Sequence, residues 1–66
     1  MKTYLIKFNN HQPIGVQTLR DKRAALNTAI TASVYSLQVT HNKQITFKEQ
    51  RKNILSITEV TENENN

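Results

Sequence analysis

The side chains of this sequence that could do chemistry are mostly cationic, and they fall in two short groups. Residues 20–23 hold three basic side chains, and residues 48–52 hold three more. If the two groups converge in the fold, they form a surface for phosphates or carboxylates. The helix start expected at residues 18–21 would add backbone N–H groups that also favour phosphate. The candidate anion contacts are Arg20, Lys22, Arg23, Lys43, Lys48, Arg51 and Lys52.

The net charge of +4 is unevenly distributed along the chain. Three of the five acids lie in the last eight residues, whereas residues 1–58 hold nine Lys or Arg against only Asp21 and Glu49, which gives this part a net charge of +7. A strongly basic body favours an acidic partner. The alternative interpretation is an ordinary solvated surface, because a small domain needs charge to stay soluble.

Side chains suited to catalysis or metal binding are few. His11 and His41 are the only imidazoles and neither belongs to a cluster with metal-ligand spacing, while Asp21 is better explained as an acid at a helix start. A serine nucleophile would need one of the histidines within hydrogen-bond reach, and no spacing indicates this for Ser33, Ser36 or Ser56. One glycine cannot build a phosphate-binding loop. We therefore expect a binding protein and not an enzyme, without metal or cofactor.

The elements that position the basic groups begin with a predicted hairpin. Residues 3–8 alternate, with Tyr4, Ile6 and Phe8 on one face, which is typical of a strand. Residues 9–13 gather turn formers, and residues 14–17 resume a short alternation. The next segment predicts a helix from Leu19 to about Ser33, with Thr18 as N-cap, so that residues 20–23 lie on its first turns.

The remaining chain alternates three more times, over residues 34–40, 44–49 and 54–60, which predicts three further strands. A helix through residues 45–60 is the alternative, but β-branched residues dominate this segment and the spacing of its apolar residues is nearer two than 3.6. The expected fold is one α+β domain over residues 1–60, an antiparallel sheet of about four to five strands in the order ββαβββ with one helix packed on one face. Residues 61–66 form an acidic, Asn-rich tail without apolar side chains, which we expect to be disordered.

The predicted core contains the inward positions of these elements. They are Tyr4, Ile6, Phe8, Val16, Leu26, Ile30, Leu37, Val39, Ile45, Phe47, Leu55 and Ile57. All four aromatic residues, Tyr35 included, fall at inward positions of an alternation, so we expect them in the core; the alternative is that they are exposed and stack on nucleic-acid bases.

The small size of the chain bears on its stability and location. At this length, folding buries only about 60% of the surface of the unfolded chain. With no cysteine, disulfides are excluded, so self-association as a homodimer is the remaining way to stabilise so small a fold.

No apolar stretch approaches the roughly 20 residues that cross a bilayer, and Lys7 interrupts the apolar segment at the start of the chain. We expect a cytoplasmic protein with no membrane partner.

The whole chain resembles, in length, composition and strand pattern, the short accessory proteins of phages and mobile elements of low-GC Gram-positive bacteria. The opening residues 4–10 and the closing residues 45–47 and 54–57 carry this likeness. The resemblance implies a class of roles, namely regulators of phage or plasmid genes and small inhibitors of a host enzyme or defence complex.

Three hypotheses follow. In the first, the basic face engages nucleic acid or a nucleoprotein complex, including an acidic or nucleic-acid-associated host protein. In the second, the protein inhibits a host enzyme or defence system, in the manner of an anti-CRISPR protein, through a sheet edge or its helix face. In the third, which is compatible with both, an edge strand extends the sheet across a dimer axis.

Overall fold

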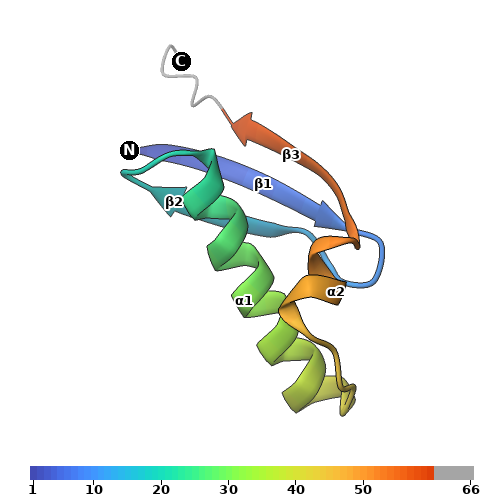
Figure 1. Ribbon diagram of the computed structural model, residues 1–66. Helices are drawn as coiled ribbons and strands as arrows, with labels where there is room; N and C mark the ends of the chain where they lie inside the picture. Colours follow the sequence, from blue (N-terminus) through green and yellow to red (C-terminus); the bar gives the residue numbers. More distant parts are fainter. Residues whose placement is uncertain (61–66) are drawn as a thin grey trace.

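Strand β1 (Lys2–Phe8) lies at the centre of a three-stranded antiparallel sheet in the computed structural model, which describes residues 1–60 (Figure 1). It pairs on one side with β2 (Ile14–Thr18) and on the other with β3 (Ile54–Val60). In this register Ile6 lies opposite Ile14 and Ile57. The predicted hairpin and the last predicted strand are confirmed, but the sheet has three strands and not four to five.

Helix α1 (Lys22–His41) packs across one face of this sheet, over β2 and β1 (Figure 1). Ala25 and Ala29 are fully buried, and their small side chains let the helix approach the strands closely. The helix begins later than predicted, because the Asp21 carboxylate caps it by accepting from the Ala24 N–H at 3.1 Å. The predicted cap, Thr18, accepts instead from the Arg20 N–H at 2.9 Å, within the turn before the helix.

The strand predicted over residues 34–40 is wrong, because α1 continues through this segment to His41. Val34 and Leu37 are buried and extend the inward stripe of Ile30, at spacings of four and three that belong to a helix. The alternate residues Tyr35 and Val39 are exposed. Tyr35, Leu37 and Val39 alternate as in a strand, but the burial of Val34 and Leu37 on one face of the helix decides the conformation.

The strand predicted over residues 44–49 is also wrong. A short helix, α2 (Phe47–Arg51), starts here with a capping box, in which the Thr46 N–H donates to Glu49 Oε1 at 2.9 Å and the Glu49 N–H donates to Thr46 Oγ1 at 3.1 Å. A Thr followed three residues later by Glu is a helix-start signature, and here it outweighs the alternation of Ile45 and Phe47. The chain then leaves α2 directly into β3, which pairs with β1 and not with its sequence neighbour.

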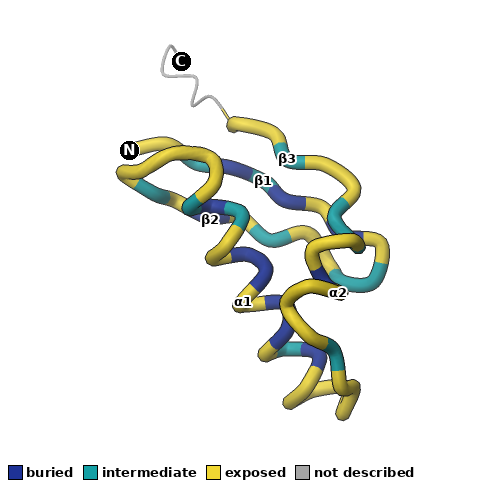
Figure 2. Tube along the Cα trace, viewed as in Figure 1, coloured by how far each residue is buried: buried dark blue, intermediate teal, exposed yellow. Residues whose placement is uncertain are grey.

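The core lies between α1 and the two strands it covers (Figure 2). Of the predicted core, six residues are buried, namely Tyr4, Ile6, Phe8, Val16, Ile30 and Leu37, while Leu26, Ile45 and Ile57 are half-buried. Val39, Phe47 and Leu55 are exposed, so their assignment to the core is wrong. The prediction missed Ala25, Ala29, Ser33, Val34 and Gln50, all of which are buried. The predicted tail, residues 61–66, lies outside the described residues.

Candidate anion-binding groove

A groove opens at the surface between α1, the last residue of α2 and the start of β3. It has a volume of about 340 Å³. Its lining residues are Arg23, Leu26, Asn27, Ile30, Arg51 and Ile54. The groove lies where α1, which packs mainly over β2 and β1, leaves the inward side of β3 only partly covered within residues 1–60.

The two arginines of this groove come from the two separate basic groups of the sequence. Arg23 lies in the first turn of α1, and the other α1 residues of the lining follow at three, four and seven positions, so they share one face of the helix. Arg51 is the last residue of α2. Each of the two basic groups thus contributes one arginine to the lining of the groove.

The chemistry of the groove suits an anion with an apolar portion. Leu26, Ile30 and Ile54 provide apolar lining, and a guanidinium near such a surface interacts more strongly with an anion than one surrounded by water. Each guanidinium presents a planar set of N–H donors that matches phosphate or carboxylate oxygens. The groove can therefore hold a phosphate or carboxylate between two arginines.

The nearby acids are already used as helix caps. The Asp21 carboxylate accepts from the Ala24 N–H, and the Glu49 carboxylate accepts from the N–H and the hydroxyl of Thr46 at 2.9 and 3.2 Å. These hydrogen bonds stabilise helix starts. The third described acid, Glu59, lies toward the other end of β3, opposite Tyr4. Both groove arginines are exposed and able to meet a ligand.

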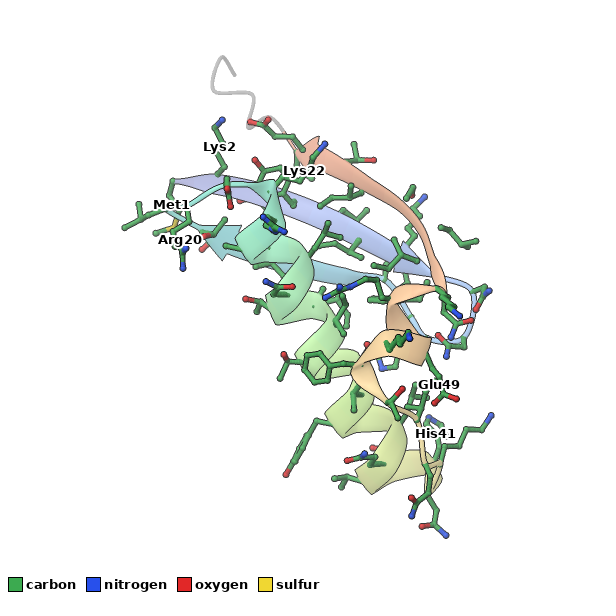
Figure 3. The ribbon with its side chains drawn as sticks, in the orientation of Figure 1. Met1, Lys2, Arg20, Lys22, His41 and Glu49 are labelled. Atoms are coloured by element: carbon green, nitrogen blue, oxygen red, sulfur yellow. The ribbon has the colours of Figure 1, made fainter. Side chains whose placement is uncertain are left out.

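The other predicted contact residues are placed in three regions, and all of them are exposed. Arg20 and Lys22 lie at the N-terminal end of α1, in the same part of the molecule as Lys2 (Figure 3). Lys48 is on α2 and Lys52 is its C-cap, so both belong to the segment that carries Arg51. Lys43 follows the C-cap of α1, the full length of the helix away from Lys22, which is about 30 Å for its 20 residues. The structure therefore separates Lys43 from Arg20 and Lys22.

Lys2 also lies near the N-terminal end of α1 (Figure 3), although it is absent from the anion contacts predicted from the sequence. It pairs with Thr18 across the hairpin, which brings it to the chain segment that leads into α1. The alternating pattern of the two strands indicated a hairpin, but the turn length left the register open.

The aromatic side chains divide between core and surface. Tyr4 and Phe8 are buried as predicted, but Phe47 is 45% exposed and Tyr35 is 67% exposed, so the prediction that all four are core is wrong for these two. Phe47 lies four residues before Arg51 in α2, and residues at this spacing are neighbours on one side of a helix. Tyr35 instead lines a separate, shallower hollow on α1, with Thr28, Thr31 and Ala32.

A pair of hydrogen-bonded amides, of which Gln50 is buried and Asn10 half-buried, holds α2, and with it Arg51, in place. Gln50 is 0% exposed and exchanges two hydrogen bonds with Asn10 of the β1–β2 loop, donated by Asn10 Nδ2 at 2.8 Å and by Gln50 Nε2 at 3.0 Å. The Asn9 N–H donates to the Asn53 carbonyl at 2.9 Å beside them. In the sequence analysis Gln50 falls between the strands predicted over residues 44–49 and 54–60; the capping box at Thr46 is the signal that could have placed it on a helix.

One histidine and one serine do meet, against expectation. His11 Nε2 lies 3.0 Å from Ser36 Oγ, and His11 Nδ1 lies 2.8 Å from the Gln12 carbonyl oxygen. This is the distance of a nucleophile from its general base, but acyl transfer also needs a cavity beside the serine for its substrate. The two cavities described above are lined by other residues. The pair ties the β1–β2 loop to the second half of α1.

Comparisons with protein-family models, with curated proteins and with solved structures found no match to this chain. Within residues 1–60, no helix combines the length and apolar character needed to span a membrane. In the same range, no three His, Asp or Glu side chains come together as a metal site would require.

Proposed function

We propose that this chain is a small nucleic-acid-binding protein without enzymatic activity, encoded by a phage or mobile element and acting in the host cytoplasm. The observation that carries the proposal is the meeting of Arg23 and Arg51 in one groove. Two separate basic segments contribute to this site, as expected if both contact the same polyanion. The phosphate backbone of the nucleic acid would run through the groove.

The distribution of charge supports a polyanionic ligand. Residues 1–60 carry nine Lys or Arg against three acids, a net charge of +6. Around the groove, basic side chains continue toward the start of α1 with Arg20 and Lys22, and along α2 with Lys48 and Lys52. A phosphate backbone places one negative charge at every nucleotide, so a linear ligand can meet several of these side chains at once.

Phe47 favours a single-stranded ligand. An exposed aromatic ring next to a basic groove is a platform on which an unpaired base can stack, whatever its identity. Phe47 shares a side of α2 with Arg51. A nucleotide whose phosphate contacts Arg51 could therefore place its base on the Phe47 ring.

Replacing Phe47 with alanine should weaken binding of a single-stranded oligonucleotide by about 5- to 150-fold, because base–aromatic stacking contributes about 1–3 kcal/mol per base. Fluorescence anisotropy with a labelled oligonucleotide measures this change. The matched control is Tyr35→Ala, which removes an exposed aromatic side chain from the other hollow. The stacking assignment is wrong if both variants bind alike.

The proposed function itself is tested by the salt dependence of binding. If six basic residues, namely Arg20, Lys22, Arg23, Lys48, Arg51 and Lys52, each neutralise a phosphate of a single strand, the plot of log K against log salt should have a slope of about −4. An oligonucleotide that does not bind at low salt would contradict the proposal.

A second candidate is a protein inhibitor of a host enzyme or defence system. It is favoured by the uncharged outer face of α1, where Tyr35 and Val39 are both exposed. A pull-down of the tagged protein from host lysate, with and without nuclease, separates the two functions. One dominant host protein that survives nuclease would favour the inhibitor, since a packed protein interface does not depend on nucleic acid.

A further inference from the structure

Strand β3 contains apolar side chains that the described part of the chain, residues 1–60, leaves exposed or half-buried. Four of its seven residues are large and apolar, yet none of the seven is buried. Ile54 and Ile57 are half-buried, Leu55 is 65% exposed and Val60 is also exposed. Figure 2 shows β3 as the least buried strand, beyond the side of the sheet that α1 covers.

β3 is also an edge of the sheet, and it lacks most of the features that keep edges from pairing. Charged side chains, proline and short length are common means of blocking an edge. The other edge, β2, has only five residues, follows Pro13 and contains Gly15. β3 has seven residues, no Lys or Arg and a single charge at Glu59. The irregularity opposite Lys7 and Phe8 lies at its start, and Ser56–Val60 pair regularly with β1.

We propose that a second copy of this chain pairs its β3 with this β3, antiparallel, about a two-fold axis at Ile57. Ile57 is the middle residue of the strand, so the pairing is centred on the strand, and the irregularity at Leu55 limits regular pairing to the residues around Ile57. Ser56 then lies opposite Thr58 of the second copy, and Glu59 lies opposite its Leu55, so no like charges face each other. The result is a six-stranded antiparallel sheet with both α1 helices on the same face.

The second copy would complete the groove. In the single chain, the groove lies beside β3, because within residues 1–60 α1 packs mainly over β2 and β1 and leaves Ile54 and Ile57 on the inward side of β3 only half-buried. In the dimer, the two β3 strands form the floor of one trough between the two α1 helices, and each copy contributes its Arg23 and Arg51. One continuous strand of nucleic acid could contact both pairs of arginines. This last step rests on the proposed function, whereas the dimer itself does not.

Two double variants at exposed positions test the pairing. S56E/T58E places like charges opposite each other twice across the axis, while S56E/T58K places opposite charges there. In both variants the carboxylate introduced at position 56 faces Lys7 of β1, so pairing within one chain is favoured equally at that position. Sedimentation equilibrium of the full chain should give twice 7.6 kDa for the natural sequence and for S56E/T58K. The dimer dissociation constant of S56E/T58E should be at least roughly tenfold higher than that of S56E/T58K.

Hydrogen exchange of the natural sequence provides a second measurement that needs no variant. Amides of β3 should exchange more slowly as the protein concentration rises, since dimerisation pairs the free edge. A protein that is monomeric at every concentration, or two variants with the same dissociation constant, would overturn the dimer. If the protein is a monomer that binds the oligonucleotide, the dimer is wrong and the proposed function is retained. If it is a dimer that does not bind the oligonucleotide, the proposed function is wrong and the dimer is retained.

Discussion

Replacing both groove arginines, as R23A/R51A, should weaken binding of a single-stranded oligonucleotide by about 10- to 100-fold at moderate salt. Each substitution removes a charged hydrogen-bond donor to phosphate, and a loss of about 0.7–1.4 kcal/mol per contact, in a partly exposed groove, gives this range. Both residues are exposed, so the fold should be retained. Fluorescence anisotropy measures the affinity, and circular dichroism confirms the fold.

The matched control for this variant is K7A/K43A. It lowers the net charge by the same amount, but Lys7 lies on the face of the sheet opposite to α1, and Lys43 lies beyond the far end of α1. If the whole charge of the protein attracts the ligand and no particular site exists, the two variants lose equal affinity. We expect the groove variant to lose at least several-fold more.

Replacing Gln50 with alanine should lower the free energy of unfolding by about 2–4 kcal/mol, because it leaves the Asn10 amide without its partner and opens a cavity. This is a large fraction of the stability expected for a domain of this size. Urea denaturation followed by circular dichroism measures the change. The same change at Gln38, which is exposed on α1, should alter stability by no more than about 0.5 kcal/mol.

A second substitution separates the hydrogen bonds of this pair from simple loss of volume. In N10A/Q50A no amide of the pair remains, so the double variant should lose less stability than the sum of the two single variants. Strict additivity would show that the two amides do not depend on each other. The reciprocal bonds at 2.8 and 3.0 Å make that outcome unexpected.

The hairpin of β1 and β2 could be predicted because strict alternation and a cluster of turn formers are local signals. The second half of α1 could not, since Tyr35, Leu37 and Val39 alternate as in a strand and only the burial of Val34 and Leu37 in the folded chain distinguishes the two. For α2 the local signal existed in Thr46 and Glu49, but the β-branched residues around it outweighed it in our interpretation.

The basic residues of the candidate site were visible in the sequence, but their grouping was not. Arg23 and Arg51 line the same groove because of how β3 pairs. β3 lies beside β1, the central strand, and α2, which directly precedes β3, is thereby placed next to α1. This pairing depends on long-range contacts that no local pattern contains. Gln50 was missed for a related reason: it is buried by Asn10, forty residues earlier in the chain.

The most direct test of the groove is the change in salt dependence between the natural sequence and R23A/R51A, measured with the same single-stranded oligonucleotide. If each arginine neutralises one phosphate, the slope of log K against log salt should become shallower by about 1.4, while K7A/K43A keeps the slope of the natural sequence. An unchanged slope in R23A/R51A would mean that phosphates do not lie in this groove and would contradict the proposed function.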